Sequence, residues 1–189
     1  MPSSSLNDIK KLLQSDWARS RLPAAPNGGR SIASTYPAIC REMEKALKLQ
    51  SRTEWDSYGQ GYASYVDAWF YRDRPEFQLA PLARGQQNFV GLHVLFCRFA
   101  PYFVCGEGSK SWSSRGGSGG FLNFDSINVI RNPAIRELLA KVDPFLSARG
   151  LVRLSKEDVA SFLPGGYEIE TNLSNAPHRL FDALFFWYD

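Results

Sequence analysis

The sequence has few of the residues that build metal sites or disulfide frameworks. Its 189 residues include three cysteines, Cys40, Cys97 and Cys105, and two histidines, His93 and His178. The cysteines show no C-x-x-C spacing and match no zinc signature with these histidines. Their odd number favours reduced thiols. We therefore expect no metal, no other cofactor and a cytoplasmic protein.

Long apolar runs and a strong charge of one sign are also missing. No apolar run is long enough to span a membrane, and the start, MPSSSLNDIKKLL, lacks the apolar region of a signal peptide. The net charge of +3 is too small to indicate a nucleic-acid partner, and the basic residues are dispersed along the chain. Hydrophobic residues at 44% and charged residues at 22% are typical of a globular protein, and the length predicts one domain over 1–189.

The most informative stretch runs from Phe89 to Gly106, FVGLHVLFCRFAPYFVCG. It contains one formally charged residue, Arg98, and is apolar at both odd and even positions. This pattern predicts a strand that is covered on both faces, and therefore a central strand of its sheet. Pro101 predicts a turn, after which Tyr102 to Cys105 predicts a returning strand. A buried helix is the alternative, and Gly91 and Pro101 argue against it.

Around this hairpin the sequence predicts several helices and a flanking strand. The strand is 65–72, and a short additional strand is expected within 121–130. Apolar residues at helical spacing, with capping residues before them, predict helices at 6–20, from Thr35 to about Lys48, at 133–148 with a kink or break before Pro144, at 155–163 and at 176–188. The final residues could instead form an edge strand. The segments 51–64 and 107–120 are expected to be loops. The predicted fold class is α+β, with an antiparallel sheet centred on 89–106 and helices packed over it.

Two glycine-rich stretches resemble phosphate-binding loops only in part. Gly106 to Ser111 ends in Lys-Ser like a Walker A motif, but Val104 and Ser109 stand where that motif requires glycine. The residues after Ser111 also do not begin the helix whose N-terminus would hold the phosphate. The run from Arg115 to Gly120 fails the G-x-G-x-x-G pattern. We therefore expect no nucleotide site at either stretch.

A cysteine nucleophile beside a histidine is another chemistry that the sequence raises. In an extended strand His93 and Cys97 share a face but lie about 13 Å apart, which is beyond the reach of a working pair. A helix over 89–99 would make them neighbours, and Cys105 could approach His93 across the hairpin. A hydrolase using His93 with Cys97 or Cys105 therefore remains an alternative to a buried histidine with a hydrogen-bond partner.

Several carboxylates are close enough in sequence or in the expected fold to form pairs. No motif fixes their separation, so solvated charge is their expected role. The pairs are Glu54 with Asp56, Asp67 with Asp73, and Glu107 with Asp125.

Trp112 is an unusual residue for its surroundings, because it lies in a segment of mainly glycine and serine. A tryptophan beside Arg and Glu is typical of a binding hot spot, although the ring could also fold back on the sheet. We therefore expect a partner-binding surface on the loops at one end of the sheet, formed by Trp55, Tyr58, Glu107, Lys110, Trp112 and Arg115. On this hypothesis Trp112→Ala weakens partner binding by roughly 2 kcal/mol and leaves folding nearly intact.

The C-terminal third of the chain carries a resemblance. A helix is followed by ARGLVRLSKEDVASFLPGG and then by HRLFDALFFWYD, in which Leu184, Phe185, Trp187 and Asp189 form an aromatic "LF-W-D" tail. This arrangement resembles the ends of small cytoplasmic immunity proteins from bacterial polymorphic-toxin and contact-dependent secretion systems. The resemblance implies a non-enzymatic protein that binds and neutralises a cognate toxin, without a cofactor.

Two other function classes stay open beside this one. The first is the hydrolase described above. The second is a nucleic-acid-binding module that uses Lys110, Trp112 and Arg115. The toxin's identity and the oligomeric state are left open by the sequence.

Overall fold

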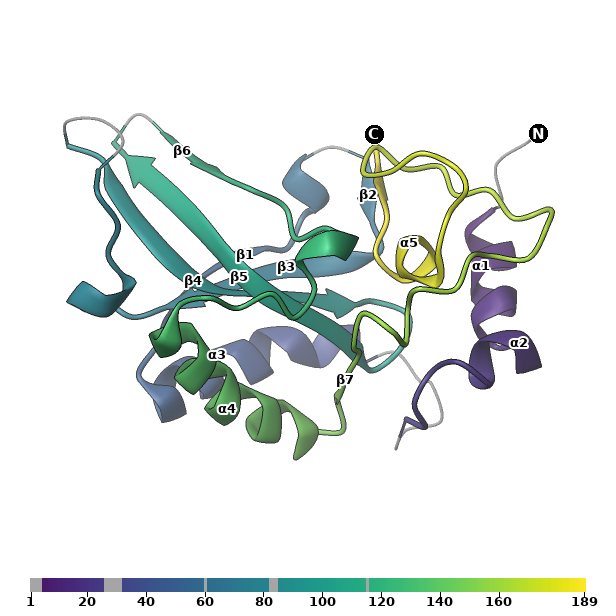
Figure 1. Ribbon diagram of the computed structural model, residues 1–189, viewed down its shortest axis with the longest axis horizontal. Coiled ribbons are helices and arrows are strands. Elements are labelled where there is room, and N and C mark those ends of the chain that lie inside the picture. Colours follow the sequence, from purple (N-terminus) through teal and green to yellow (C-terminus); the bar gives the residue numbers. More distant parts are fainter. Residues whose placement is uncertain (1–4, 26–31, 60, 82–84, 115) are drawn as a thin grey trace.

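A curled antiparallel sheet forms the centre of the protein, as seen in the computed structural model in Figure 1. The structure describes residues 5–25, 32–59, 61–81, 85–114 and 116–189. The strand order is β1-β3-β4-β5-β6, and a short β7 pairs with β5 in parallel. The strands are β1 Gln50–Glu54, β3 Tyr65–Tyr71, β4 Gln87–Cys97, β5 Tyr102–Ser113, β6 Gly116–Gly119 and β7 Val152–Arg153. The fold is α+β, as the sequence predicts.

The predicted central hairpin is confirmed, but its second strand is much longer than expected. β4 and β5 pair from Phe96 opposite Phe103 to Gln87 opposite Trp112. The segment 107–120 is therefore not a loop, because most of it continues β5 and then turns into β6. Glycine and serine have little strand propensity of their own, so the long partner strand β4 supplies the ladder that holds them extended.

The segment 51–64 is also not one loop. Its first residues belong to β1, which pairs with β3 from Gln50 opposite Tyr71 to Glu54 opposite Asp67. Further along, Tyr62–Ala63 forms β2, which pairs with the C-terminal strand β8, Trp187–Tyr188. The mostly polar sequence of β1 hides the strand, because an edge strand needs no continuous apolar run.

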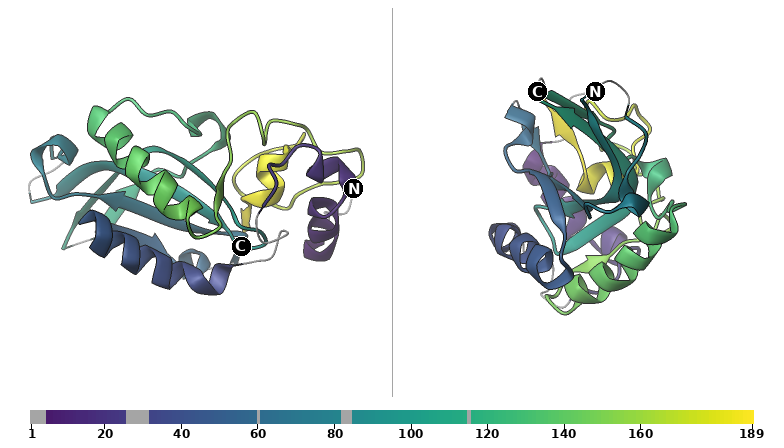
Figure 2. Two further views of the ribbon diagram at one scale, coloured as in Figure 1. Left: turned by 90° about the horizontal axis from the view of Figure 1, so that it is seen from below. Right: turned by 90° about the vertical axis from the view of Figure 1, so that its left-hand side faces the viewer.

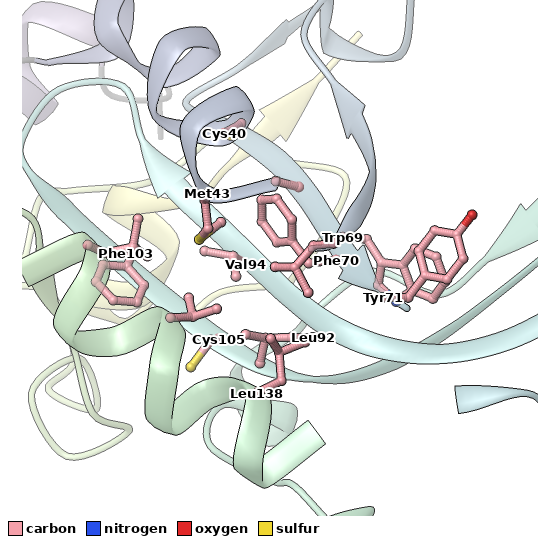
Figure 3. Close-up of a cluster of buried hydrophobic side chains, with 14 of the residues drawn as sticks. Cys40, Met43, Trp69, Phe70, Tyr71, Leu92, Val94, Phe103, Cys105 and Leu138 are labelled. Carbon is pink, nitrogen blue, oxygen red and sulfur yellow. The ribbon is translucent and has the colours of Figure 1, made fainter. Parts of the chain in front are cut away.

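Two helices cover what we call the outer face of the sheet, the face that carries Phe70, Leu92, Phe96 and Phe103. They are α3, Tyr36–Leu47, and α4, Pro133–Ser147, and Figure 2 shows both on the outside of the curl. Figure 3 shows the apolar core between these helices and the strands. The core side chains on this face include Met43, Phe70, Leu92, Val94, Phe103 and Leu138.

Helix α4 continues through Pro144, so the break expected before this proline is absent. Val142 and Leu146 flank the proline and are fully buried against the sheet. This packing holds the helix together across the hydrogen bond that proline cannot donate. The chain leaves the helix at Gly150, whose φ of 78° is a conformation that glycine adopts readily.

The N-terminal helix is split, in contrast to the prediction of one helix over 6–20. The capping box between Ser5 and Asp8 is present and starts α1, Leu6–Leu13. A second short helix, α2 at Asp16–Arg19, has its own N-cap at Ser15, whose Oγ accepts a hydrogen bond from the Ala18 N–H. The additional serine cap explains the split, because Ser15 competes with the continuing helix for backbone hydrogen bonds.

The C-terminal segment fills one half of the inner face, the concave face that carries Asp67, Trp69 and His93. Figure 2 shows this segment inside the curl of the sheet. The helix expected at 176–188 is confined to α5, Leu180–Leu184, and the final residues form the edge strand β8, which was the alternative. Three side chains of α5, Leu180, Phe181 and Leu184, and that of Phe185 pack in one cluster with side chains of β3, β4 and β5. Those strand residues include Tyr65, Leu95, Cys97 and Val104.

Two further expected elements are replaced by short turns. The capping box at Ser155 and Asp158 is formed, but the residues after it are a turn and not the helix expected at 155–163. The strand expected within 121–130 is instead a 3-10 helix at Phe124–Ser126. The other 3-10 helices are Ala33–Thr35, Ser57–Gly59 and Pro75–Phe77. Within the described ranges, no helix has the length and apolar character needed to cross a membrane.

Candidate functional site

The half of the inner face that the C-terminal segment leaves uncovered contains a groove. It lies between strand β1 on one side and β5 with β6 on the other, and its volume is about 520 Å3. The side chains around it come from both sides of the curl and include Arg52, Tyr58, Asp67, Lys110, Trp112 and Phe121. Three of the residues predicted for partner binding, Tyr58, Lys110 and Trp112, are therefore brought together here.

The floor of the groove is a buried carboxylate with three partners. Asp67 is 3% exposed, and its Oδ1 lies 2.5 Å from Nε2 of His93. The ammonium of Lys110 lies 3.6 Å from the same oxygen. The hydroxyl of Tyr58 donates a hydrogen bond of 2.8 Å to Oδ2. Each oxygen of the carboxylate is thus held by groups of the protein itself.

Strand alternation and register build this network. Asp67 and Trp69 are on the same face of β3, and Trp69 is the residue of β3 directly opposite His93 of β4. Asp67 and His93 are therefore a diagonal cross-strand pair, which long side chains can bridge. Gly108 of β5 leaves room for the ring, because a Cβ at that position would lie 3.1 Å from Nδ1 of His93.

Electrostatics keeps the Asp67 carboxylate charged despite its burial. Burial by itself raises the pKa of Asp67, but the attraction and hydrogen bond of His93, with Lys110 and Tyr58, outweigh it, so this pKa lies below its ordinary value. Burial, together with the Asp67 charge, raises the pKa of Tyr58, so its hydroxyl keeps the proton that it donates. A buried carboxylate of this kind is stable because its hydrogen-bond and charge partners are all present.

Aromatic rings form one wall of the groove. Trp112 stacks on Phe89 with ring centroids 5.3 Å apart, and it meets Tyr71 and Trp69 edge-on at 5.5 and 6.0 Å. The guanidinium of Arg52, from β1, lies 3.9 Å from the centre of the Trp112 ring. Trp112 therefore does not project from a mobile loop. It folds back on the sheet, as the alternative interpretation of the sequence had it.

The rim next to the C-terminal segment carries an exposed aromatic residue. Phe121 is 48% exposed, and its ring stacks on Trp187 with centroids 6.2 Å apart. Tyr58 meets both rings edge-on, at 5.2 Å from Phe121 and 5.5 Å from Trp187. In the sequence, Phe121 is recognisable only as an isolated aromatic residue after two glycines.

Two other predicted binding residues, Trp55 and Glu107, are not in the groove. Trp55 lines a separate pocket beside α3, together with Arg41 and Thr53. Glu107 has a local structural role, since its carboxylate accepts hydrogen bonds from the backbone N–H groups of Arg131 and Asn132, just before α4. A carboxylate at a helix N-terminus is stabilising. Arg115 lies outside the described residues.

The cysteines are poorly placed for the hydrolase hypothesis. Cys105 is on the outer face and its thiol packs among the core residues of Figure 3, whereas His93 is on the inner face. Strand β4 runs from Gln87 to Cys97 and includes both residues, so Cys97 is not the helical neighbour of His93. Burial raises the pKa of Cys97 and Cys105 to about 11 and that of Cys40 to about 12. These thiols stay protonated at neutral pH, and the thiolate is the nucleophilic form.

His93 itself offers little access to a substrate. Its ring is almost fully buried, and one of its two nitrogens is engaged by Asp67. Across the part of the chain that the structure describes, no group of three or more His, Cys, Asp or Glu side chains is arranged to hold a metal ion. The groove thus presents aromatic rings, the cations of Arg52 and Lys110, the carboxylate of Glu54, several hydroxyl groups and strand backbone.

Comparisons with known proteins add no family to these observations. The chain matches no protein-family model, no curated protein and no solved structure.

Proposed function

We propose that this chain is a non-enzymatic protein that binds one partner protein and blocks its activity, as the immunity protein of a toxin pair does. In this proposal the groove on the inner face receives part of the partner, a toxin that acts in the cytoplasm of the same bacterial cell. The observation that carries the proposal is the groove itself. It combines exposed aromatic surface at Phe121 with cationic side chains at Arg52 and Lys110.

The chemistry of the groove supports binding without turnover. Aromatic and arginine side chains are frequent in the energetically dominant parts of protein interfaces, and rim charges mainly set orientation and association rate. The polar group deepest in the groove, Asp67, is already held by His93, Tyr58 and Lys110. It stabilises the site and leaves its neighbours to contact the partner.

One of the residues that carry the sequence resemblance, Trp187, contacts the lining of the groove. Leu184 and Phe185 are buried and anchor the C-terminal segment inside the curl. This anchoring places Trp187 next to Tyr58 and Phe121 at the rim. In the proposed function, Trp187 of the aromatic tail holds Tyr58 and Phe121 in place for the partner.

A growth experiment with the protein encoded by the gene next to that of this chain tests the proposal. We expect that protein to stop bacterial growth when expressed alone and to be harmless when this chain is expressed beside it. Purified together, the two proteins should form a complex of fixed stoichiometry. A harmless neighbour, or protection that persists in a variant of this chain that no longer binds it, would refute the proposal.

The role first expected of Trp112 changes with the structure. Its ring packs on Phe89 and Tyr71 and supports Arg52, so Trp112→Ala removes part of the inner-face packing as well as groove surface. A loss of binding in that variant would not separate folding from recognition. Phe121 is the better residue for such a test because nearly half of its surface is exposed.

A further inference from the structure

Strand β6 is a sheet edge with backbone groups left open. It is the last strand of the sheet order, it pairs with β5 on one side, and all four of its residues are exposed. Within the described ranges no strand pairs with its other side. In an antiparallel ladder alternate residues direct their N–H and C=O groups away from the neighbour, so half of the residues of β6 present these groups outward.

The composition of β6 leaves this edge without the usual protection. Natural edge strands carry charged side chains, prolines or bulges that prevent pairing with another chain. The four residues of β6 are Gly-Gly-Ser-Gly. The hydroxyl of Ser118 points back to the sheet and lies 2.9 Å from that of Ser111.

Close packing on β5 explains why glycine is needed here. A Cβ at Gly117 would lie 2.7 Å from the carbonyl oxygen of Ser111, and one at Gly119 would lie 2.7 Å from Cγ of Lys110. Glycine loses more conformational freedom than other residues when it is ordered in a strand. Strand β6 is therefore costly in conformational entropy to order, and no charged side chain or proline protects its open side.

The groove lies beside the open edge of β6 and is bounded on its other side by β1, the second edge strand of the sheet. β1 is the opposite terminal strand of the same sheet, and Arg52, Thr53 and Glu54 of β1 line the groove together with β6. A segment in extended conformation fits such a site better than a helix, because it can continue the ladder of β6. Phe121 follows directly after β6 and gives an apolar side chain of that segment a surface to cover.

We propose that β6 is a docking edge, to which an extended segment of a partner protein adds as a further strand, with an apolar side chain of that segment against Phe121. This inference rests on the proposed function and specifies how the partner binds. Backbone hydrogen bonds to β6 provide affinity, and the alternating side chains that enter the groove provide specificity.

Selection of peptides provides a test that does not need the natural partner. A phage-displayed library of random linear peptides is selected against the full chain, and the enriched peptides are synthesised and titrated. Gly117→Pro and Ser118→Pro are compared with the wild type, because one of any two adjacent residues directs its N–H outward and proline removes it. Ser118→Ala keeps the backbone donor, and Gly165→Pro places a proline at an exposed glycine outside the groove.

We expect at least one of the two β6 proline variants to bind the peptides about tenfold more weakly or worse, since each lost ladder contact costs a factor of this order. Both control variants should bind like the wild type. Bound peptide should also slow hydrogen exchange of the amides at 116–119 in the wild-type chain. This second measurement does not depend on how the proline variants fold.

The inference would be overturned if no peptide is enriched, if both β6 proline variants bind the peptides as tightly as the wild type does, or if bound peptide leaves hydrogen exchange at 116–119 unchanged. These outcomes are distinct from failure of the proposed function, which the growth experiment measures. If this chain neutralises the toxin but their complex leaves hydrogen exchange at 116–119 unchanged, the proposed function stands and this binding mode is excluded.

Discussion

The two faces of the sheet are built from the same strands but differ in what covers them. On the outer face, α3 and α4 bury a layer of apolar side chains that includes Phe70, Leu92 and Phe96. On the inner face, alternate residues of the same strands include Asp67, His93 and Lys110. One face therefore provides most of the apolar core, and the other combines core with an open groove.

The inner face is itself divided into two halves. The C-terminal segment covers the half around Leu95, Cys97 and Val104 with apolar contacts. No described segment covers the half around Asp67 and Trp112 in this way, and ion pairs, hydrogen bonds and stacked rings hold its side chains together. Polar networks cost more to bury than apolar side chains, so a fold that needed stability alone would have little reason to keep this one. This difference supports the proposal that the groove is the binding surface.

The outer face should respond most strongly to truncation. Phe96 is fully buried and stacks on Tyr36 of α3 with ring centroids 4.9 Å apart. Phe96→Ala leaves a cavity between sheet and helix, and we expect a loss of about 3–5 kcal/mol in the free energy of unfolding by urea. Leu79→Ala, at an exposed leucine, is the control and should change stability little. Similar losses of unfolding free energy in the two variants would contradict the conclusion that the outer face provides most of the apolar core.

The polar half of the inner face should be nearly as sensitive, for a different reason. Asp67→Ala leaves the imidazole of His93, the ammonium of Lys110 and the hydroxyl of Tyr58 without their common acceptor. We expect a loss of about 3 kcal/mol in the free energy of unfolding, at the lower end of the range for broken buried pairs because Lys110 is partly exposed. Asp73→Ala, at an exposed aspartate, is the control. A stability equal to wild type in Asp67→Ala would show that the network is dispensable.

Protonation of Asp67 in acid should lower the free energy of unfolding, by less than the Asp67→Ala substitution does. The folded-state pKa of Asp67 is lowered by His93, Lys110 and Tyr58, while Glu54 lies opposite it on β1. A lowered pKa means that this contribution is fully present above the ordinary aspartate value of about 4 and is lost as the pH falls below it. The free energy of unfolding, measured from pH 6 to pH 2, should therefore fall more steeply in wild type than in Asp67→Asn. Parallel curves would contradict the prediction.

Much of the outer-face architecture can be predicted from the sequence. Apolar residues at both odd and even positions identify the central hairpin, and helical spacing identifies α3 and α4, because these elements bury continuous surfaces. The edge strands β1 and β6 have no such pattern. They are extended because β3 and β5 offer them hydrogen bonds, and this depends on the neighbouring strand more than on the residues themselves.

The groove is predictable only in its residue types. Tyr58, Lys110 and Trp112 are recognisable as aromatic and basic residues among small polar ones. The pairing of Asp67 with His93 spans 26 positions in the sequence and depends on the register of β3 against β4, which local patterns do not determine. Phe121 gains its importance from Trp187, which the chain brings to the same rim from its other end.

Phe121, at the rim of the groove, is where we expect the smallest change in stability together with a large change in binding. Phe121 is 48% exposed and rests on Tyr58 and Trp187, so Phe121→Ala should change the free energy of unfolding by no more than about 0.5 kcal/mol. If the groove receives the partner, the same variant should weaken its binding by about 2 kcal/mol, measured by calorimetry, because an exposed aromatic anchor is lost. Phe162→Ala is the matched control, since that phenylalanine is 52% exposed and lies outside the groove lining. Equal binding by the two variants would mean that the partner contacts another surface. A selective loss in Phe121→Ala would show that the uncovered half of the inner face serves recognition, while the covered face serves the fold.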